Sequence, residues 1–155
     1  MNKKELLIIA NLRKNARESL TMMSKKTAIP ISTIYERLKS YEGKIITRYT
    51  SLVDFSQMGF TIRATIFLKV KREFRDRLKE HLLLSKSLNS VYRVNNGYDF
   101  MLDGIFKEVK DVEVFLERLD NDFGVEDTYV SYIIDEIKRE DFMSSPEYLK
   151  LFFNF

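Results

Sequence analysis

The stretch from Ser19 to Tyr49 has the spacing of two short helices joined by a tight turn, with a strand leaving the second helix. Ser19 stands where the hydroxyl of a helix N-cap would, and the break at Ala28-Ile29-Pro30 ends the first helix. We expect Ser32 to cap the second helix. The apolar side chains of that helix recur every three or four residues and form one stripe that can pack on the first helix: Ile34, Leu38 and Tyr41. This arrangement is a helix-turn-helix, a motif whose expected partner is duplex DNA.

Basic residues are concentrated in the first third of the chain. Residues 1–50 carry eleven Lys and Arg against four Asp and Glu, a net charge of +7, whereas residues 51–155 carry fifteen against nineteen, a net charge of −4. Lys and Arg bind duplex DNA by releasing counterions from its phosphates, and an acidic surface repels the duplex. We therefore expect only the first third to face DNA, although a solvated basic surface is the alternative interpretation of the charge alone.

Two sets of residues are candidates for contacting DNA. Polar and aromatic side chains of the second helix are expected to contact base edges: Ser32, Thr33, Tyr35, Arg37, Lys39 and Ser40. Basic side chains that flank this helix are expected to contact phosphates: Lys25, Lys26 and Arg48. The alternative role of Arg37 is an ion pair with a carboxylate such as Glu18, which would hold the two helices together.

The composition excludes several chemistries. The chain has no cysteine and one histidine, so it cannot form disulfides or thiolate-metal sites, and we expect neither a metal nor a cofactor. His81 lies beside Leu78 and Leu82 in a predicted helix and is expected to be structural, and a lone histidine is a poor basis for catalysis, so we expect no enzyme activity. The apolar run from Leu6 to Ala10 is too short for a signal peptide, and no run has the length of a membrane span, which predicts a cytoplasmic location.

Beyond Thr50 the pattern changes to apolar alternation with helices between. Every second residue from Ile62 to Val70 is apolar, which predicts a strand with one fully apolar face. Asn95-Asn96-Gly97 lies between two apolar runs and predicts a hairpin, because Asn and Gly tolerate positive φ. The predicted order is strand, helix, strand, strand, helix, strand, over residues 62–70, 73–84, 91–94, 98–106, 109–123 and 128–137. This order predicts an α+β fold whose second domain has the ferredoxin-like βαββαβ arrangement, with two helices covering one face of a four-stranded antiparallel sheet.

The other face of this sheet is predicted to be open. Phe67 and apolar residues of the last strand would lie on or near it. A second copy of the sheet is the economical cover for such a face, so we expect a homodimer.

A tail follows the last predicted strand. Ser145 and Pro146 are expected to begin a short helix. Its apolar residues recur at helical spacing and are too apolar to be left in water: Leu149, Phe152 and Phe155. We expect this amphipathic helix to dock on the sheet domain or on a neighbouring subunit.

Four motifs occur in the order and near the spacing of a known family. The first three lie in the opening helix, the recognition helix and the connector: Glu5, Ile8, Ile9, Leu12, Asn15, Ala16 and Arg17; Thr33, Ile34 and Arg37; and Glu42, Gly43, Ile45, Ile46, Tyr49 and Gly59. The fourth is Val-Asn-Asn-Gly-Tyr-Asp-Phe-Met-Leu, from Val94 to Leu102. With these motifs the chain resembles the Lrp/AsnC (feast/famine) transcription regulators from about Lys4 to Asp141.

The resemblance implies a sequence-specific regulator that binds double-stranded DNA and assembles from dimers into tetramers or octamers. Its domains would be an N-terminal helix-turn-helix, winged-helix-like DNA-binding domain (1–50), a connector (51–60), a ferredoxin-like regulatory and dimerisation domain (61–141) and the tail (142–155).

The family often binds an amino acid as effector, near the hairpin between the second and third strands of the sheet. The residues in that place are Asn95, Asn96, Gly97 and Asp99. Asp99 can accept hydrogen bonds from the ammonium of an amino acid, while the Asn side chains and a Gly-containing turn can donate to its carboxylate. Asn95-Asn96 replaces the Thr-Gly of the family and Val130 replaces a hydroxyl residue, so we expect a changed ligand preference or no ligand. The alternative role of Asp99, which lies beside the hairpin turn, is to cap backbone amides.

Two other functions are compatible with this architecture. Tetrapyrrole decarboxylases of the siroheme type share it, but they use basic and histidine residues on the sheet, where this chain is acidic and nearly without histidine. The second is an effector-binding module whose helix-turn-helix does not bind DNA, and the net charge of +7 over residues 1–50 argues against it.

Overall fold

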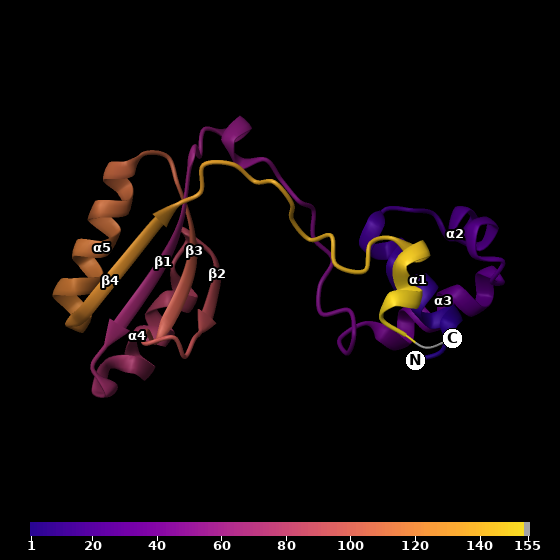
Figure 1. Cartoon of the computed structure of the whole chain (residues 1–155), viewed down its shortest axis with the longest axis horizontal. Helices are drawn as coiled ribbons and strands as arrows, with labels where there is room; N and C mark the ends of the chain where they lie inside the picture. Colours follow the sequence, from indigo (N-terminus) through magenta and orange to yellow (C-terminus); the bar gives the residue numbers. More distant parts are fainter. Residues whose placement is uncertain (154–155) are drawn as a thin grey trace. The chain divides into compact units, whose positions relative to one another are not determined.

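The computed structural model describes residues 1–153, which form two compact units. The first unit contains Met1–Leu52 and the C-terminal residues from Ile137 onward, and the second contains Val53–Glu136. The chain therefore passes from one unit to the other twice (Figure 1). The N-terminal helices and the C-terminal segment thus belong to the same unit.

The described part of the N-terminal unit contains three α-helices, α1 (Lys3–Lys14), α2 (Leu20–Thr27) and α3 (Ile31–Tyr41). Ser19 is the N-cap of α2, as predicted, and its hydroxyl accepts a hydrogen bond from the Met22 amide at 3.2 Å. The three helices and the turn between α2 and α3 each contribute a buried side chain to a common core: Ile8, Met23, Ile29 and Ile34. The helix-turn-helix is therefore confirmed.

The start of α3 differs from the prediction. Pro30 and not Ser32 is the N-cap, with φ −56° and ψ 142°, and no described side chain caps the helix. The proline ring restricts φ to about this value, and the Pro30 carbonyl accepts the first helical hydrogen bond, from the Ile34 amide at 3.0 Å. The helix therefore begins one residue before Ser32, whose side chain is exposed on the first turn.

Among the described residues, no strand leaves α3. Gly43 has a φ of 71°, and the turn that follows brings the amides of residues 44–46 to 2.9–3.1 Å from the Tyr41 carbonyl. One isolated bridge, from Glu42 to Ile46, stands where the strand was predicted. The turn uses the backbone groups that a strand would need for pairing.

The sheet unit, all of whose residues are described, has the predicted βαββαβ order. Its elements are β1 (Ile62–Val70), α4 (Arg75–Leu84), β2 (Leu88–Arg93), β3 (Phe100–Phe106), α5 (Val109–Phe123) and β4 (Val125–Tyr132). Short 3-10 turns, η1 (Phe55–Met58) and η2 (Arg72–Phe74), precede β1 and α4. The strands pair antiparallel in the order β2-β3-β1-β4, which confirms the ferredoxin-like fold.

One face of the sheet forms the core of this unit. The alternate residues of β1 that point to this face are fully buried: Ala64, Ile66, Leu68 and Val70. They pack with β3 and with both helices, through Leu78 and Leu82 of α4 and Val112, Leu119 and Phe123 of α5. Both helices therefore cover the same face, and the other face carries the intervening residues.

The last strand is shorter and earlier than predicted. β4 begins at Val125, directly after Gly124, which ends α5 with a φ of 56°. After β4 the Ile133 amide still donates to the Arg63 carbonyl at 2.8 Å. The partner strand β1 begins at Ile62, so it has no further backbone groups with which the residues after Ile133 could pair. Ile134 is consequently 99% exposed, because an apolar sequence cannot extend a strand beyond its partner.

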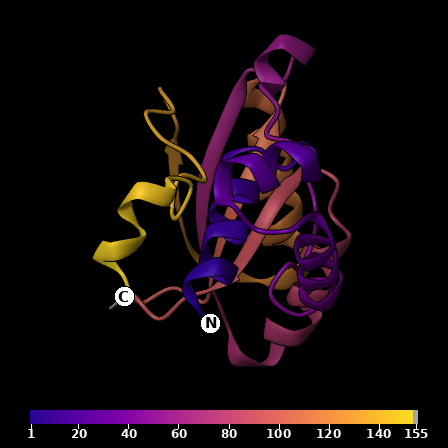
Figure 2. The same ribbon diagram turned by 90° about the vertical axis from the view of Figure 1, so that its right-hand side faces the viewer.

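The tail docks elsewhere than predicted. Residues 137–153, here called the C-terminal strap, include a 3-10 helix, η3 (Pro146–Leu151), which lies beside α1 (Figures 1 and 2). Leu149 is 1% exposed and packs on Leu6 and Ala10, so the strap belongs to the N-terminal unit and not to the sheet unit. Leu149 is therefore buried as predicted, but Phe152 is 51% exposed, and the tail docks on α1 and not on the sheet domain. Phe155, part of that prediction, lies outside the described residues.

Candidate functional site

The exposed face of α3 gathers most of the candidate base-contacting residues. Ile34 and Tyr41 are buried and Leu38 is half-buried against the core, so the stripe predicted to face inward does so. The remaining side chains of the helix are exposed, except for a half-buried Thr33: Ile31, Ser32, Tyr35, Glu36, Arg37, Lys39 and Ser40. Such a helix presents hydrogen-bond donors, acceptors and an aromatic ring on one side.

Two members of this set already have partners. The Ser40 hydroxyl donates to the Arg37 carbonyl at 2.8 Å. The Arg37 guanidinium lies at the flank of the exposed face toward α1, with Nη1 3.1 Å from Oε1 of Glu5. The Arg37 side chain remains 48% exposed, so this ion pair leaves much of the guanidinium accessible.

The carboxylate partner of Arg37 is therefore Glu5 and not Glu18, the residue that the sequence suggested. Glu18 pairs instead with Lys26, and its side chain is largely buried in that contact. Sequence reasoning placed Glu5 only in the opening motif of the family, and it identified neither this ion pair nor the capping box that Glu5 forms with Asn2.

The candidate phosphate-contacting residues differ in whether they already form an ion pair. Lys25 and Lys26 both lie in the last turn of α2 and are exposed, but Lys25 has no ion pair within residues 1–153. Arg48 is exposed in the irregular segment after α3. Lys25 and Lys26 precede α3 in the chain and are separated from it by the turn that joins α2 to α3.

The hairpin between β2 and β3 divides the candidate effector residues into two groups. Asn95, Asn96 and Gly97 are exposed, and Gly97 has a φ of 96°, which favours glycine. Asp99 is buried, and its Oδ2 accepts a hydrogen bond from the Val70 amide at 3.0 Å.

The Asp99 carboxylate also has a partner on its other oxygen. Oδ1 lies 2.8 Å from Nε of Arg75, at an angle that makes the contact an ion pair and not a hydrogen bond. The Asp99 amide donates to the Leu68 carbonyl at 2.8 Å. Asp99 thus ties the hairpin to the end of β1 and the start of α4, which is the backbone-capping role considered as the alternative.

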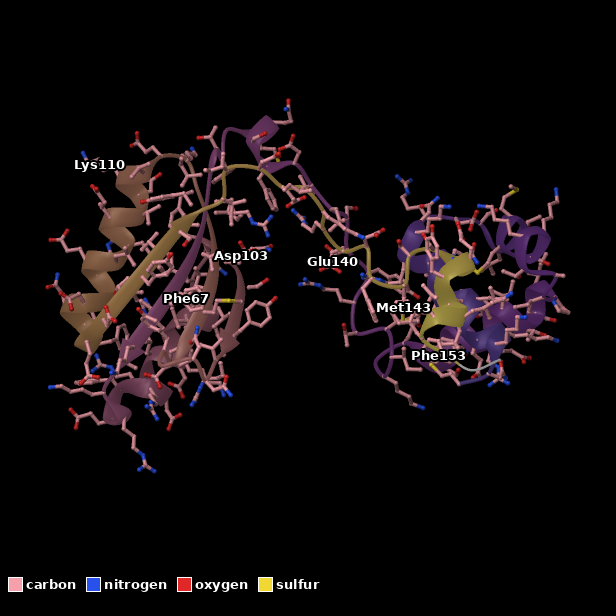
Figure 3. All side chains as sticks on the ribbon, viewed as in Figure 1. Phe67, Asp103, Lys110, Glu140, Met143 and Phe153 are labelled. Carbon is pink, nitrogen blue, oxygen red and sulfur yellow. The ribbon has the colours of Figure 1, made fainter. Side chains whose placement is uncertain are left out.

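The open face of the sheet combines an aromatic row with a charged network. The ring of Phe67 lies 5.7 Å from that of Tyr98 and 6.1 Å from that of Tyr129. Beside them, Asp103 accepts hydrogen bonds from Arg63 at 2.8 and 3.0 Å, which raises the pKa of Arg63 (Figure 3 labels Phe67 and Asp103). Val130, in contrast, packs against the core on the helix side.

Residues 1–153 hold neither a metal-binding cluster nor a membrane-spanning helix. They contain no group of His, Cys, Asp and Glu that could hold a metal ion, and no helix long and apolar enough to cross a membrane. The His81 ring stacks 4.9 Å from the Phe123 ring, a packing contact between α4 and the end of α5.

Known proteins of one family match both the sequence and the structure. Residues 63–142, just over half of the chain, match the Lrp/AsnC ligand binding domain. The HTH-type transcriptional regulator FL11 of Pyrococcus abyssi is 28% identical over 133 residues, which cover 85% of this chain and 88% of the relative. An uncharacterised HTH-type transcriptional regulator of Pyrococcus horikoshii is 26% identical over 140 residues, which cover 90% of this chain and 94% of the relative.

Solved structures share the fold. A transcriptional regulator of Neisseria meningitidis in complex with L-Met superposes with a TM-score of 0.83 at 20% identity, covering 90% of this chain and 93% of the other. B. subtilis LrpC superposes with a TM-score of 0.80 at 24% identity, covering 89% and 97%. The relatives are transcriptional regulators, which decides against the tetrapyrrole decarboxylase alternative. The chain belongs to the Lrp/AsnC family and is a transcription regulator, not an enzyme.

Proposed function

We propose that this regulator binds duplex DNA with sequence specificity through the exposed face of α3. The observation that carries the proposal is the position of this face on a basic unit. The N-terminal unit with the strap has fourteen Lys and Arg against seven Asp and Glu, a net charge of +7, whereas the sheet unit has twelve against sixteen, a net charge of −4. Only the unit that carries α3 attracts a polyanion.

The residues of this unit divide by the kind of contact they would make. Base edges are contacted by Arg37 and by exposed or half-exposed neighbours on α3: Ser32, Thr33, Tyr35, Lys39 and Ser40. Phosphates are contacted by Lys25, Lys26 and Arg48, which lie on either side of α3 in the sequence.

A homodimer formed through the open face of the sheet presents two copies of α3 to DNA. The support is the row of Phe67, Tyr98 and Tyr129, of which Tyr129 is more than half exposed in the single chain. Burying such a row against a second copy removes apolar surface from water. Two recognition helices in successive major grooves require half-sites about 34 Å apart, so the binding site is an approximate palindrome. Dimers assemble further into tetramers or octamers, as the family resemblance implies.

An amino-acid effector binds near the β2–β3 hairpin, with a preference different from that of relatives. Two observations support a ligand: the match to a ligand binding domain and the L-Met complex of the Neisseria regulator. Here Asn95, Asn96 and Gly97 are exposed and can contact the ligand, while Asp99 shapes the hairpin. The protein acts in the cytoplasm, where its DNA partner is found.

The test is selection of binding sites from random duplex DNA by the full-length protein, followed by gel shifts. We expect an enriched approximate palindrome. Lys25→Ala should weaken binding to all sequences and lower the slope of log K against log salt by about one for each phosphate that is no longer neutralised. Lys79→Ala, an exposed lysine of the acidic sheet unit, is the matched control and should change neither. Failure to enrich any motif at low salt would refute the proposal.

The effector is tested separately by calorimetric titration of the protein with the twenty amino acids. A response abolished by changes at Asn95 or Asn96 supports the hairpin site. A response to leucine, lysine or glutamine that Asp99→Ala abolishes without loss of stability would show that the ligand uses Asp99 directly.

A further inference from the structure

Glu5 offers its two carboxylate oxygens to two different parts of the N-terminal unit. Oε2 accepts a hydrogen bond from the Asn2 amide at 2.8 Å, and the Glu5 amide donates to Oδ1 of Asn2 at 3.0 Å. This capping box fixes the side chain at the start of α1. The other oxygen, Oε1, is the one that lies 3.1 Å from Nη1 of Arg37.

The surroundings make Glu5 a rigid support. Its side chain is 14% exposed, far less than the 48% of Arg37, so the pair has a covered carboxylate and an accessible guanidinium. Tyr41, at the end of α3, is buried nearby, and burial together with the charge of Glu5 raises the pKa of its phenol.

The ion pair occupies one end of a planar group that has five N–H donors. Nη1 faces Glu5, which leaves Nε and Nη2 for another acceptor. Arginine recognises the edge of a guanine with two parallel hydrogen bonds, and that geometry needs a guanidinium whose plane and direction are set.

We propose that Glu5 is a positioning residue for DNA recognition: it holds Arg37 in the orientation that reads a base edge, and it does not contact DNA itself. The inference rests on the proposed DNA recognition by α3. It gives Glu5 a second role beside its cap, and it makes the specificity of α3 depend on a residue of α1.

The role has an electrostatic signature that a purely structural residue lacks. Glu5 places a negative charge close to the DNA-facing surface, which opposes phosphates of every sequence. Removing that charge should therefore raise affinity for non-specific DNA while the preference for the base that Arg37 reads falls. A residue that only stabilised α1 would change both affinities in the same direction.

The experiment compares four full-length variants, Glu5→Gln, Arg37→Ala, the double variant and Asn2→Ala. Glutamine keeps an acceptor for the Asn2 amide, so Glu5→Gln preserves the cap and removes the charge. Asn2→Ala weakens the cap and leaves Glu5 and Arg37 in place. Base preference is measured by selection from sites randomised at each position, non-specific affinity by competition with unrelated duplex, and stability by thermal melting.

We expect Glu5→Gln and Arg37→Ala to relax the same base position, by roughly 10-fold in preference, and the double variant to lose no more than Arg37→Ala alone. Asn2→Ala should lower the melting temperature and keep the base preference. The proposal is overturned if Glu5→Gln keeps the preference, or if Asn2→Ala relaxes it equally. If the wild-type protein enriches no motif, the DNA recognition itself is refuted and the role of Glu5 with it; a motif that survives Glu5→Gln refutes the role of Glu5 alone.

Discussion

Replacing Leu149 by alanine should loosen the C-terminal strap from α1 and destabilise the N-terminal unit. Leu149 is fully buried against Leu6 and Ala10, and Met143 and Phe153 of the strap pack beside it (Figure 3). Buried Leu-to-Ala replacements cost about 2–5 kcal/mol, with the larger values where the surroundings cannot close the cavity. This cluster is small and lies under a surface segment that can shift inward. We therefore expect a loss of about 2–3 kcal/mol in the free energy of unfolding of the unit.

The other contacts of the strap do not compensate for this loss. Arg13 of α1 donates to the Glu140 carboxylate at 2.9 Å, to the Glu140 carbonyl at 2.8 Å and to the Phe142 carbonyl at 3.1 Å. These groups are exposed, and exposed ion pairs contribute only about 0–1 kcal/mol. The burial of Leu149 is thus the main contribution to docking of the strap. Leu149→Ala cannot cost more free energy than this docking contributes, because the variant can at most release the strap.

Leu151→Ala is the matched control, because Leu151 belongs to the same 3-10 helix and is 77% exposed. It should change stability by less than about 0.5 kcal/mol. Urea denaturation measures the free energy of unfolding, and hydrogen exchange of α1 amides reports whether the loss is local to the strap and its helix. Equal losses for the two leucine variants would refute the assignment of Leu149 as the anchor.

Three further changes test the packing of the sheet unit and the strap. Gly104→Ala should destabilise the sheet unit by about 1–3 kcal/mol, because the new Cβ would collide with Cε2 of the buried Phe106 ring and lie 3.0 Å from its Cζ; an unchanged thermal midpoint would contradict this. Asp99→Ala should cost about 1–3 kcal/mol in ligand-free protein, since it removes a buried acceptor, and calorimetric melting that shows wild-type stability would exclude the capping role. The hydrogen bond from Lys138 holds the pKa of Asp141 below its ordinary value. A depressed pKa contributes stability that is present above the unfolded pKa and lost as pH falls through the folded one, so hydrogen exchange of the strap, corrected for intrinsic rates, should rise below about pH 4 and not above it.

The elements that were predicted correctly depend on signals within a few residues. The Ser19 hydroxyl needs only an amide three residues along to cap α2. The alternation from Ile62 to Val70 needs only one buried face, and Gly124 ends α5 because it adopts positive φ without strain. Each of these signals acts between neighbouring residues and does not depend on how the rest of the chain folds.

The elements that were predicted wrongly depend on partners far away in the sequence. The apolar residues Ile133, Ile134 and Ile137 favour a strand, but β1 does not extend far enough to pair with this segment. The helical spacing of Leu149 indicated that its side chain is buried, but not which surface of the protein covers it. α1 has two apolar faces, with Ile8 toward the other helices and Leu6 toward the strap, and only the folded chain shows which one the tail covers.

The candidate site also combines a feature that local sequence predicts with one that depends on a distant residue. Helical spacing was enough to predict which side of α3 is exposed, because the buried stripe determines the opposite face. It could not predict the ion pair of Arg37 with Glu5, because the two residues lie on different helices, far apart in the sequence, and Glu5 also forms the capping box with Asn2. One carboxylate therefore serves a local and a tertiary contact. A loss of stability in a Glu5 variant would not separate the two contacts, and base preference compared with an Asn2 variant is the measurement that does.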